Sequence, residues 1–495
     1  MGWTGRFERL FIGGDWVGPR GQDRLEVINP ATEEFVGAAP SASREDADAA
    51  VAAARNAFDS GPWPRMPLDE RLDILRRFRD LYAEHEEVIA ELVTEEMGCP
   101  ITLSRSFQAA APRLILETNL ELAETYPFQS IRRASTGSAL VTHEPVGVVT
   151  AVVPWNVPQS IAMLKVAPAL ISGCTIILKP APQTPLDAYL MADLLERSGV
   201  PAGVFNLLPA ERETSEYLVS HPGVDKVAFT GSTAAGRRVA ALCGTALRRV
   251  TLELGGKSAA VFLDDADLDD AVERLRFGSL RNSGQVCSLK TRLIVSKRRE
   301  RELLDRLVAL VDSMPMGDPF DPATQIGPLV STRQRSVVEG YIDIGIAEGA
   351  RVVVGGGRPS GHDRGWYVEP TVFADVLPGQ RIAQEEIFGP VLSVLTYENE
   401  DEAVAIANDS CYGINGAVFA GDLEHGLTVA GRIRTGTVEL NGSPAGLRAP
   451  MGGFKASGIG REQGYEGLAS YTETRSIGIT ADLADTLEGK VPIRT

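Results

Sequence analysis

Short apolar, β-branched runs alternate with amphipathic segments along the middle of the chain. The apolar runs are 146–153, 175–180, 203–209 and 226–231, and the amphipathic segments are 184–199 and 232–244. Apolar strands separated by helices of about ten to fifteen residues are typical of βαβ units, in which helices cover both faces of a parallel sheet. The pattern therefore predicts a doubly wound α/β lobe.

A second alternating series follows residue 263. Its apolar runs include 291–296, 349–357 and 389–397, and its amphipathic segments are 268–284, 299–314 and 401–410. This series predicts a second doubly wound lobe, with the boundary between the lobes near Gly255 and Gly256. Before residue 146, a hairpin-like segment at 9–17 precedes long amphipathic helices at 43–58 and 68–98. Such helices usually pack on a sheet, so we assign them no chemistry.

The composition is that of a globular protein with more than one core. The chain has 495 residues, of which 44% are apolar and 23% charged, and it is too long for one ordinary core. The formal net charge of -17 disfavours a nucleic-acid partner or an anionic membrane surface. The N-terminal segment does not resemble a secretory signal, and the longest uncharged stretch, 145–164, contains Pro154 and Pro158, so it would span a membrane poorly.

The cysteines are scattered and form no CxxC pair. They are Cys99, Cys174, Cys243, Cys287 and Cys411. This arrangement predicts a protein of the reducing cytoplasm, without structural disulfides and without a zinc cluster or other metal site.

Three stretches at predicted strand ends could carry chemistry. In AFTGSTAAG, a strand runs through Gly231 and Ser232 into a helix that contains Gly236, and a helix N-terminus of this kind can bind a pyrophosphate. An ordinary strand-to-helix turn explains the same residues equally well. LGGKS is not a nucleotide-binding P-loop, because Thr251 stands where the first glycine is required.

Glu253 and Asn156 each follow an apolar strand. A carboxylate partly removed from water has a raised pKa, as a general base needs, although a surface pair with an arginine such as Arg248 is the more common arrangement. Asn156 lies between Pro154 and Pro158, which could hold its amide as a fixed hydrogen-bond donor to an oxyanion.

Cys287 stands in NSGQVCSLK, behind a glycine and among small polar residues. Gly284 lets the backbone bend so that the thiol and its own N–H can face a cavity, which suits a nucleophile. A small structural residue remains the alternative for a lone cysteine. The five histidines have no motif context that would support a cysteine hydrolase, although a spatial partner stays possible.

Six short segments, some discussed above and some later in the chain, together resemble the aldehyde dehydrogenase superfamily. PWN, FTGST, ELGGKS, GQVC, EEIFGP and PMGGFKASGIGRE occur in that family's order and approximate spacing, over nearly the full chain. The resemblance is to the NAD(P)-dependent, hydrolytic, non-acylating type. It implies an α/β fold of two doubly wound Rossmann-like lobes, one for the cofactor and one catalytic, with a small β oligomerisation arm.

The resemblance also implies roles for individual residues. Cys287 matches the catalytic thiol, Glu253 the base that activates water, and Asn156 the oxyanion amide, while Lys165 and Glu462 match a proton path. The positions that match the cofactor site are Val153, Pro154, Trp155, Lys179, Gly231, Ser232, Gly236, Leu254, Gly255, Glu386 and Phe388. The cofactor is expected to be NAD, but Pro182 replaces a ribose-binding glutamate of many NAD-preferring members, so NADP stays possible.

The resemblance further implies domain boundaries and an assembly. Residues 1–122 and 146–256 would form the cofactor domain, and residues 457–471 would return to it. Residues 257–456 would form the catalytic domain. Residues 123–145 and 472–495 would form the arm through which a homodimer or homotetramer assembles. The expected reaction oxidises an aldehyde to the carboxylic acid through a thioester on Cys287. A coenzyme A-acylating enzyme, a thiol hydrolase and a non-catalytic cofactor-binding scaffold are the alternatives. Uncharged residues near the site (Val157, Gln159, Ser160, Val286 and Ser288) favour an uncharged, apolar aldehyde.

Overall fold

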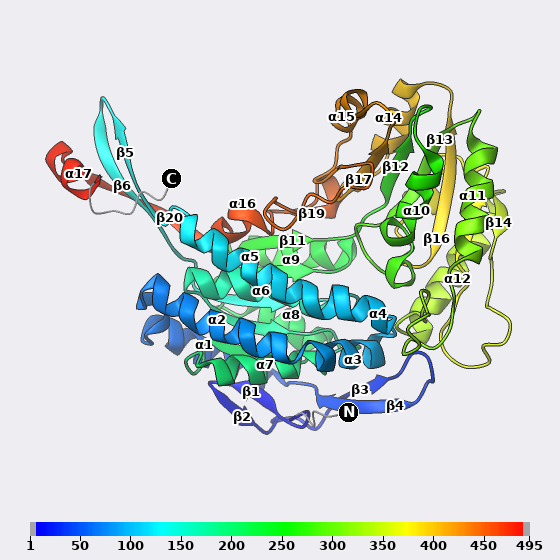
Figure 1. Cartoon of the computed structure of the whole chain (residues 1–495). Helices are drawn as coiled ribbons and strands as arrows, with labels where there is room; N and C mark the ends of the chain where they lie inside the picture. Colours follow the sequence, from blue (N-terminus) through cyan, green and yellow to red (C-terminus); the bar gives the residue numbers. More distant parts are fainter. Residues whose placement is uncertain (1–5, 489–495) are drawn as a thin grey trace.

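The computed structural model describes residues 6–488 and contains two large mixed sheets joined side by side, with a narrow β arm at one end (Figure 1). The predicted α/β class with two Rossmann-like lobes and a small arm is confirmed. The arm projects at the upper left of Figure 1, and the lobe that contains β12 and β13 lies at the upper right.

The first sheet has a parallel centre of strands that are buried on both faces. Its order is β19-β11-β10-β7-β8-β9-β1-β2, and β7, β8, β9, β10 and β11 pair in parallel within it. The strands are β1 (Leu10–Ile12), β2 (Asp15–Val17), β7 (Val148–Val152), β8 (Thr175–Lys179), β9 (Phe205–Leu207), β10 (Lys226–Thr230), β11 (Arg249–Glu253) and β19 (Gly458–Ile459). Continuous apolar runs form these central strands because helices cover both sides.

Helices pack on both faces of the first sheet. One core cluster joins side chains of α1, α8 and α9 to one face, and another joins α2, α3, α5, α6 and α7 to the other. The helices of this lobe are α1 (Arg44–Asp59), α2 (Leu68–Glu84), α3 (Glu86–Met97), α4 (Ile101–Leu103), α5 (Ala111–Thr125), α6 (Pro158–Ser172), α7 (Asp187–Ser198), α8 (Arg212–Ser220), α9 (Thr233–Thr245) and α16 (Gly464–Ala469), with short turns η1 (Trp63–Arg65) and η4 (Lys455–Ser457).

Three features of this lobe differ from the sequence expectation or were not anticipated. The continuous pattern over 68–98 is two helices, α2 and α3, which meet at His85. A π-helix, η2 (Ser104–Ala110), links α4 to α5, and a separate hairpin pairs β3 (Arg24–Ile28) with β4 (Phe35–Pro40). Neither has a strong signal in the spacing of apolar residues.

The second sheet has the order β14-β15-β16-β13-β12-β17-β18. Its strands are β12 (Ser258–Phe262), β13 (Lys290–Ser296), β14 (Arg351–Val354), β15 (Thr371–Ala374), β16 (Val391–Tyr397), β17 (Gly416–Phe419) and β18 (Glu439–Leu440). The helices around it are α10 (Leu268–Gly278), α11 (Glu300–Asp312), α12 (Thr332–Ala347), α13 (Arg381–Gln384), α14 (Glu400–Asn408) and α15 (Leu423–Ala430). Separate apolar clusters fill its two faces.

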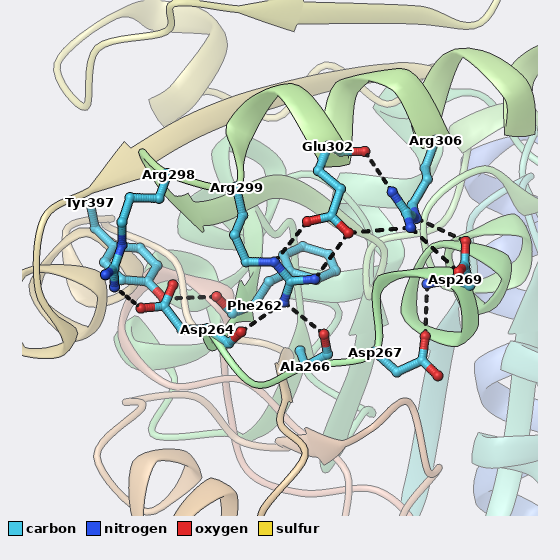
Figure 2. Close-up of polar contacts among 10 residues, drawn as sticks. All are labelled: Phe262, Asp264, Ala266, Asp267, Asp269, Arg298, Arg299, Glu302, Arg306 and Tyr397. Carbon is cyan, nitrogen blue, oxygen red and sulfur yellow. Dashed lines mark hydrogen bonds and ion pairs between the residues drawn. The ribbon is translucent and has the colours of Figure 1, made fainter.

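Polar contacts fix the start of α11 to the loop after β12 (Figure 2). Arg299 donates to the backbone carbonyls of Asp264 and Ala266, at 3.0 and 2.7 Å, and pairs with Glu302 at 3.0 Å. Arg298 reaches the Asp264 carboxylate, but its side chain is 81% exposed. The cluster lies away from the strand ends that carry the site, so its role is structural.

The arm is a three-stranded antiparallel sheet with the order β20-β6-β5. It consists of β5 (Gln129–Ala134), β6 (Gly137–Pro145) and β20 (Thr472–Ile479), and α17 (Ala481–Glu488) folds back onto it. Ala484 is buried, and Arg133 on β5 pairs with Asp485 at 2.7 Å and Glu488 at 2.8 Å. The rest of the C-terminal tail, 489–495, lies outside the described residues.

None of the helices within residues 6–488 is both long enough and apolar enough to cross a membrane. No cluster of three or more His, Cys, Asp or Glu side chains in that range could hold a metal ion. The five cysteines are free, and Cys411 is exposed.

Candidate active site

The parallel register brings the predicted site residues to one edge of the first sheet. Lys179 is the last residue of β8 and pairs with Val152, and Glu253 is the last residue of β11 and pairs with Thr230. Asn156 follows β7 after a short turn. Because the carboxyl ends of parallel strands share an edge, these side chains open toward the second lobe, where doubly wound sheets bind ligands.

Cys287 enters this region from the second lobe on a sharply bent loop. The turn η3 (Arg281–Gly284) includes Asn282 and Ser283, both with a φ of 54°, before Gly284 at a φ of 77°. A Cβ on Gly284 would lie 2.1 Å from the carbonyl oxygen of Gly389, so only glycine fits there. The bend sets Cys287 in a cavity that Lys257, Glu386 and Phe388 also line.

This arrangement strongly disfavours ionisation of the Cys287 thiol. Burial raises its pKa to about 12, and the carboxylates of Glu386 and then Glu253 add to that rise, while Arg281 opposes it. Both acids are therefore close enough to act on the sulfur. The thiol carries its proton at neutral pH until its surroundings change.

Asn156 is held against the cysteine loop by several hydrogen bonds. Its side-chain amide donates to the carbonyl of Gln285 at 2.8 Å, and its own carbonyl accepts from the amides of Asn282 and Gln108, each at 3.0 Å. The residue is 3% exposed. The Asn156 amide is thus held in place by a hydrogen bond to Gln285, two residues before Cys287, and its role as an oxyanion donor stays a prediction.

Glu253 is a buried carboxyl group without a hydrogen-bond partner on either side-chain oxygen among the described residues. Burial, and then the neighbouring charge of Glu462, raise its pKa well above the usual range. Arg248, the alternative partner that the sequence suggested, instead donates to the backbone carbonyls of Val219, His221 and Val224. The expectation of a Glu253–Arg248 pair is therefore wrong, and Glu253 is left with a raised pKa, as a proton acceptor needs.

Lys165 and Glu462 form a buried ion pair next to Glu253. The Lys165 amine lies 2.5 Å from a Glu462 carboxylate oxygen and donates to the Thr230 hydroxyl at 2.8 Å. Their side chains are 0% and 3% exposed, and the second Glu462 oxygen has no partner within the described chain. The pair thus connects α6 to the segment after β19 and leaves an acceptor oxygen free beside the general-base candidate.

The predicted phosphate turn is open at a helix N-terminus. Ser232 is the N-cap of α9 and accepts from the Ala235 N–H at 3.3 Å, and the first turn of the helix is exposed to solvent. A Cβ on Gly236 would lie 2.4 Å from a methyl carbon of Leu254, and one on Gly231 would lie 2.7 Å from the Phe229 ring. Small residues therefore keep this turn compact, and its free N–H groups fit an anionic diphosphate.

Lys179 provides a cation at the same edge. Its side chain is 6% exposed, burial lowers the pKa of its amine to about 8, and it forms no ion pair among residues 6–488. Its carbonyl accepts from the Val153 N–H at 3.1 Å, which joins β8 to the turn that continues through Pro154. A buried amine without a carboxylate partner fits the hydroxyl oxygens of a ribose.

Glu386 and Phe388 face the first lobe from the second. The Gly256 N–H donates to a Glu386 oxygen at 2.9 Å, and a Cβ on Gly255 would lie 2.2 Å from the other oxygen. The rings of Trp155 and Phe388 meet edge to face with centroids 5.3 Å apart. Glu386 and Phe388 thus line the Cys287 cavity, and Trp155 adds a second ring beside Phe388. A carboxylate and aromatic rings are suitable neighbours for a planar ring with an attached ribose.

Sequence reasoning missed Arg281 and Lys257 and misjudged Gln159. Arg281 lies beside the Cys287 loop, and Lys257 is a 2% exposed amine without a hydrogen-bond partner among the described residues, in the Cys287 cavity. The Gln159 amide accepts from Tyr82 and donates to Asp187, so it points away from the thiol. Proximity of this kind depends on tertiary packing, which no single-sequence motif encodes.

The fold and site define an α/β oxidoreductase with a thiol-bearing loop between two doubly wound lobes. The family model described as "Aldehyde dehydrogenase family" matches residues 16–477. Geranial dehydrogenase of Castellaniella defragrans is 46% identical over 95% of this chain and 98% of its own, and 3-succinoylsemialdehyde-pyridine dehydrogenase of a Pseudomonas species is 42% identical over 95% and 98%.

Solved structures agree. A Mycobacterium tuberculosis aldehyde dehydrogenase complexed with NAD+ is 45% identical, with a TM-score of 0.94 over 96% of this chain and 98% of that one. A Pseudomonas syringae aldehyde dehydrogenase mutant with NAD+ and octanal is 40% identical, with a TM-score of 0.93 over 95% and 96%. The chain therefore belongs to the aldehyde dehydrogenase family.

Proposed function

We propose that the protein oxidises an aldehyde to the carboxylic acid with NAD, through a covalent thioester on Cys287. The observation that carries this proposal is the convergence of three groups: the Cys287 thiol, the Asn156 amide held to its loop, and the unpartnered Glu253 carboxyl group that acts on the thiol pKa. A nucleophile, an oxyanion donor and a base are the requirements of acyl transfer.

In the first half-reaction, the Cys287 thiol loses its proton to water, and its sulfur bonds to the aldehyde carbon. The carbonyl double bond opens, and the oxyanion accepts hydrogen bonds from the Asn156 amide and the Cys287 backbone N–H. When bound, NAD supplies the acceptor for the hydrogen that leaves this carbon as hydride. The carbon–oxygen double bond re-forms, and Cys287 carries a thioester.

In the second half-reaction, Glu253 takes a proton from water, and the water oxygen bonds to the thioester carbon. The carbon–sulfur bond breaks, Cys287 returns as a thiolate, and the acid leaves. Glu253 then has to release its proton from a buried position. The adjacent Lys165–Glu462 pair, with a free Glu462 oxygen, is the path that we propose for that release.

Lys179, Gly231, Ser232 and Gly236 would hold the adenosine and diphosphate end of NAD. Glu386 would hold the second ribose, and Trp155, Phe388, Leu254 and Gly255 would border the reactive ring, with Val153 and Pro154 shaping the turn beside it. Relatives that bind NAD+ support the choice of cofactor. Pro182 places no carboxylate next to Lys179 to repel a 2′-phosphate, so NADP belongs in every assay.

The arm, the domain limits and the location complete the proposal. We propose a homodimer or homotetramer paired through the arm, because β20 is an edge strand whose outer side has no partner strand among the described residues. The proposed cofactor domain consists of residues 1–122, 146–256 and 457–471. The proposed catalytic domain is 257–456, and the proposed arm consists of 123–145 and 472–495. Five free cysteines support a cytoplasmic location.

The test is the production of reduced nicotinamide from a panel of aldehydes by the wild type, Cys287→Ala and Cys411→Ala. Wild type and Cys411→Ala are expected to reduce NAD, while Cys287→Ala is not, because only Cys287 lies in the site. Steady reduction by Cys287→Ala would contradict the mechanism. Turnover that required coenzyme A would indicate the acylating alternative. Ester cleavage without nicotinamide would indicate a thiol hydrolase, and NAD binding without turnover would indicate a non-catalytic scaffold.

A further inference from the structure

Arg281 begins the turn that leads to Cys287, and no carboxylate pairs with it among the described residues. Its Nε is buried without a hydrogen-bond partner, and it forms no ion pair within the described part of the chain. One terminal nitrogen lies 3.4 Å from the Ser288 hydroxyl, and the guanidinium stacks on the Phe107 ring at 4.7 Å.

Neighbouring groups do not neutralise this charge. Glu439 is the carboxylate whose field acts on Arg281, but it pairs with Lys290 at 2.5 Å and accepts from Asn415 at 2.9 Å. Arg276, which lines the same pocket, is different because Glu273, Gln325 and Ser313 occupy its donors. A desolvated cation without a counter-ion is costly unless a ligand supplies the negative charge.

Arg281 lines a pocket of about 340 Å³ that is large enough for a small organic molecule. Its other lining residues include Leu103, Phe277 and Met314, and none of the lining residues is acidic. The pocket is thus apolar in its walls and positive at Arg281.

Arg281 links this pocket to the Cys287 loop. Arg281 touches Ser288, which directly follows Cys287, and its charge acts on the Cys287 sulfur. Phe107, on which Arg281 stacks, belongs to the π-helix η2, whose Gln108 donates to the Asn156 carbonyl and whose Phe107 carbonyl accepts from Ser160. The same wall therefore joins Arg281 to the thiol and the oxyanion donor.

Resting on the proposed function, we propose that Arg281 selects aldehydes that carry a carboxylate at the end remote from the reacting carbon. The aldehyde carbon would reach Cys287 while the carboxylate pairs with the guanidinium, with the apolar walls around the linking carbons. This differs from the uncharged aldehyde that the sequence favoured, because that prediction considered only Val157, Gln159, Ser160, Val286 and Ser288, and none of these is charged.

The experiment compares kcat/KM for para-carboxybenzaldehyde and para-isopropylbenzaldehyde, which have similar shape and differ in charge. The same comparison uses succinic semialdehyde and isohexanal. Wild type is expected to prefer the carboxylate of each pair. Arg281→Met should lower that preference by about 10- to 100-fold, mainly by a loss on the carboxylate substrate, as expected for a charged hydrogen-bond partner. Arg281→Lys should retain part of it.

Arg274→Met is the matched control, because Arg274 is an exposed arginine of the same segment that pairs with Asp270 and does not line the pocket. It should leave the ratio unchanged. A wild type that oxidises the neutral aldehydes better, or an Arg281→Met ratio equal to wild type, would overturn the proposal for Arg281 while leaving aldehyde oxidation intact. Absence of turnover with all aldehydes would instead overturn the proposed function.

Inhibition of the wild type gives a second readout that does not depend on the variant's folding. Benzoate should compete with para-isopropylbenzaldehyde and lose potency as salt is added, whereas benzyl alcohol should inhibit far less. Equal inhibition by the two compounds would contradict a cationic subsite.

Discussion

At the scale of single residues, the site depends on acidic groups whose ionisation is disfavoured by burial. Cys287 has a pKa of about 12 and Glu386 a pKa of about 7, both because burial disfavours the charged form. Glu253 is raised as well, with no hydrogen bond to either oxygen in the described residues. Perturbed acids of this kind gather at reactive sites, because chemistry there requires protons to move.

The Cys287 pKa predicts how the free thiol reacts. Alkylation by uncharged iodoacetamide should become about tenfold faster per pH unit between about pH 7 and pH 10, without a plateau, because only the thiolate reacts. Glu386→Gln removes a like charge that is present above its pKa of about 7, so it should speed alkylation above that pH and not at about pH 5. A plateau near neutrality would contradict the assigned thiol state.

Glu253→Gln separates the two half-reactions. The variant should still form one equivalent of reduced nicotinamide in a burst, with steady turnover about 100-fold or more below wild type, because water loses its base. Stopped-flow absorbance measures both phases. Since the carboxylate form is required and the Glu253 pKa is raised, wild-type steady turnover should rise with pH above the normal range of glutamate. An unchanged steady rate in the variant would exclude Glu253 as the base.

At the scale of elements, buried polar contacts join segments that lie far apart in the chain. The Lys165–Glu462 pair fixes α6 to the strand-and-turn region after β19. Lys165→Met should lower the free energy of unfolding by about 3–5 kcal/mol, because it leaves Glu462 buried and unpaired. The double variant Lys165→Met with Glu462→Gln should recover part of that loss in urea denaturation, and a double variant no more stable than the single would contradict this account.

The start of α11 offers a second matched comparison. Arg299→Met removes donors to two backbone carbonyls and should cost about 1–3 kcal/mol of unfolding free energy. Arg298→Met removes an exposed pair with Asp264 and should stay within about 0.5 kcal/mol of wild type. If chemical denaturation showed equal losses of unfolding free energy for the two variants, the burial of a contact would not determine its contribution to stability (Figure 2).

Sequence patterns anticipated some elements and missed others for physical reasons. Alternation of apolar strands and helices indicated both lobes, since burial on two faces leaves long apolar runs such as β8. The break at His85 was missed because apolar spacing continues across it. The π-helix η2 was missed because its i→i+5 bonds leave no distinct periodicity.

For the site too, the sequence could indicate some residues and not others. Cys287, Glu253 and Asn156 stand in short motifs at strand ends, so the sequence could indicate them. Arg281 could not be indicated, because its significance comes from a missing counter-ion and from contacts to Phe107 and Ser288.

At the scale of the whole molecule, two sheets lie side by side and a narrow arm projects from one end (Figure 1). The strand ends of the first sheet face a loop of the second, so the relative position of the lobes determines the site. The arm lies at the far end, with β20 as an edge strand and Ile477 on it 41% exposed.

Assembly through the arm predicts a mass of two or four times 53.0 kDa by light scattering. Ile477→Asp should shift the protein toward the single-chain mass, because a buried strand-to-strand contact does not accept a carboxylate. Leu377→Asp, a change at a 65% exposed residue away from the arm, is the control and should leave the mass unchanged. A monomeric wild type would refute the proposed assembly.

The central claim is that Cys287 carries the acyl group. The most direct measurement is the mass of Glu253→Gln after mixing with an aldehyde and NAD, followed by peptide mapping. We predict an adduct on the Cys287 peptide equal to the aldehyde less two hydrogens, absent from Cys287→Ala. Full turnover without an adduct on that peptide, or the adduct on another residue, would contradict the account.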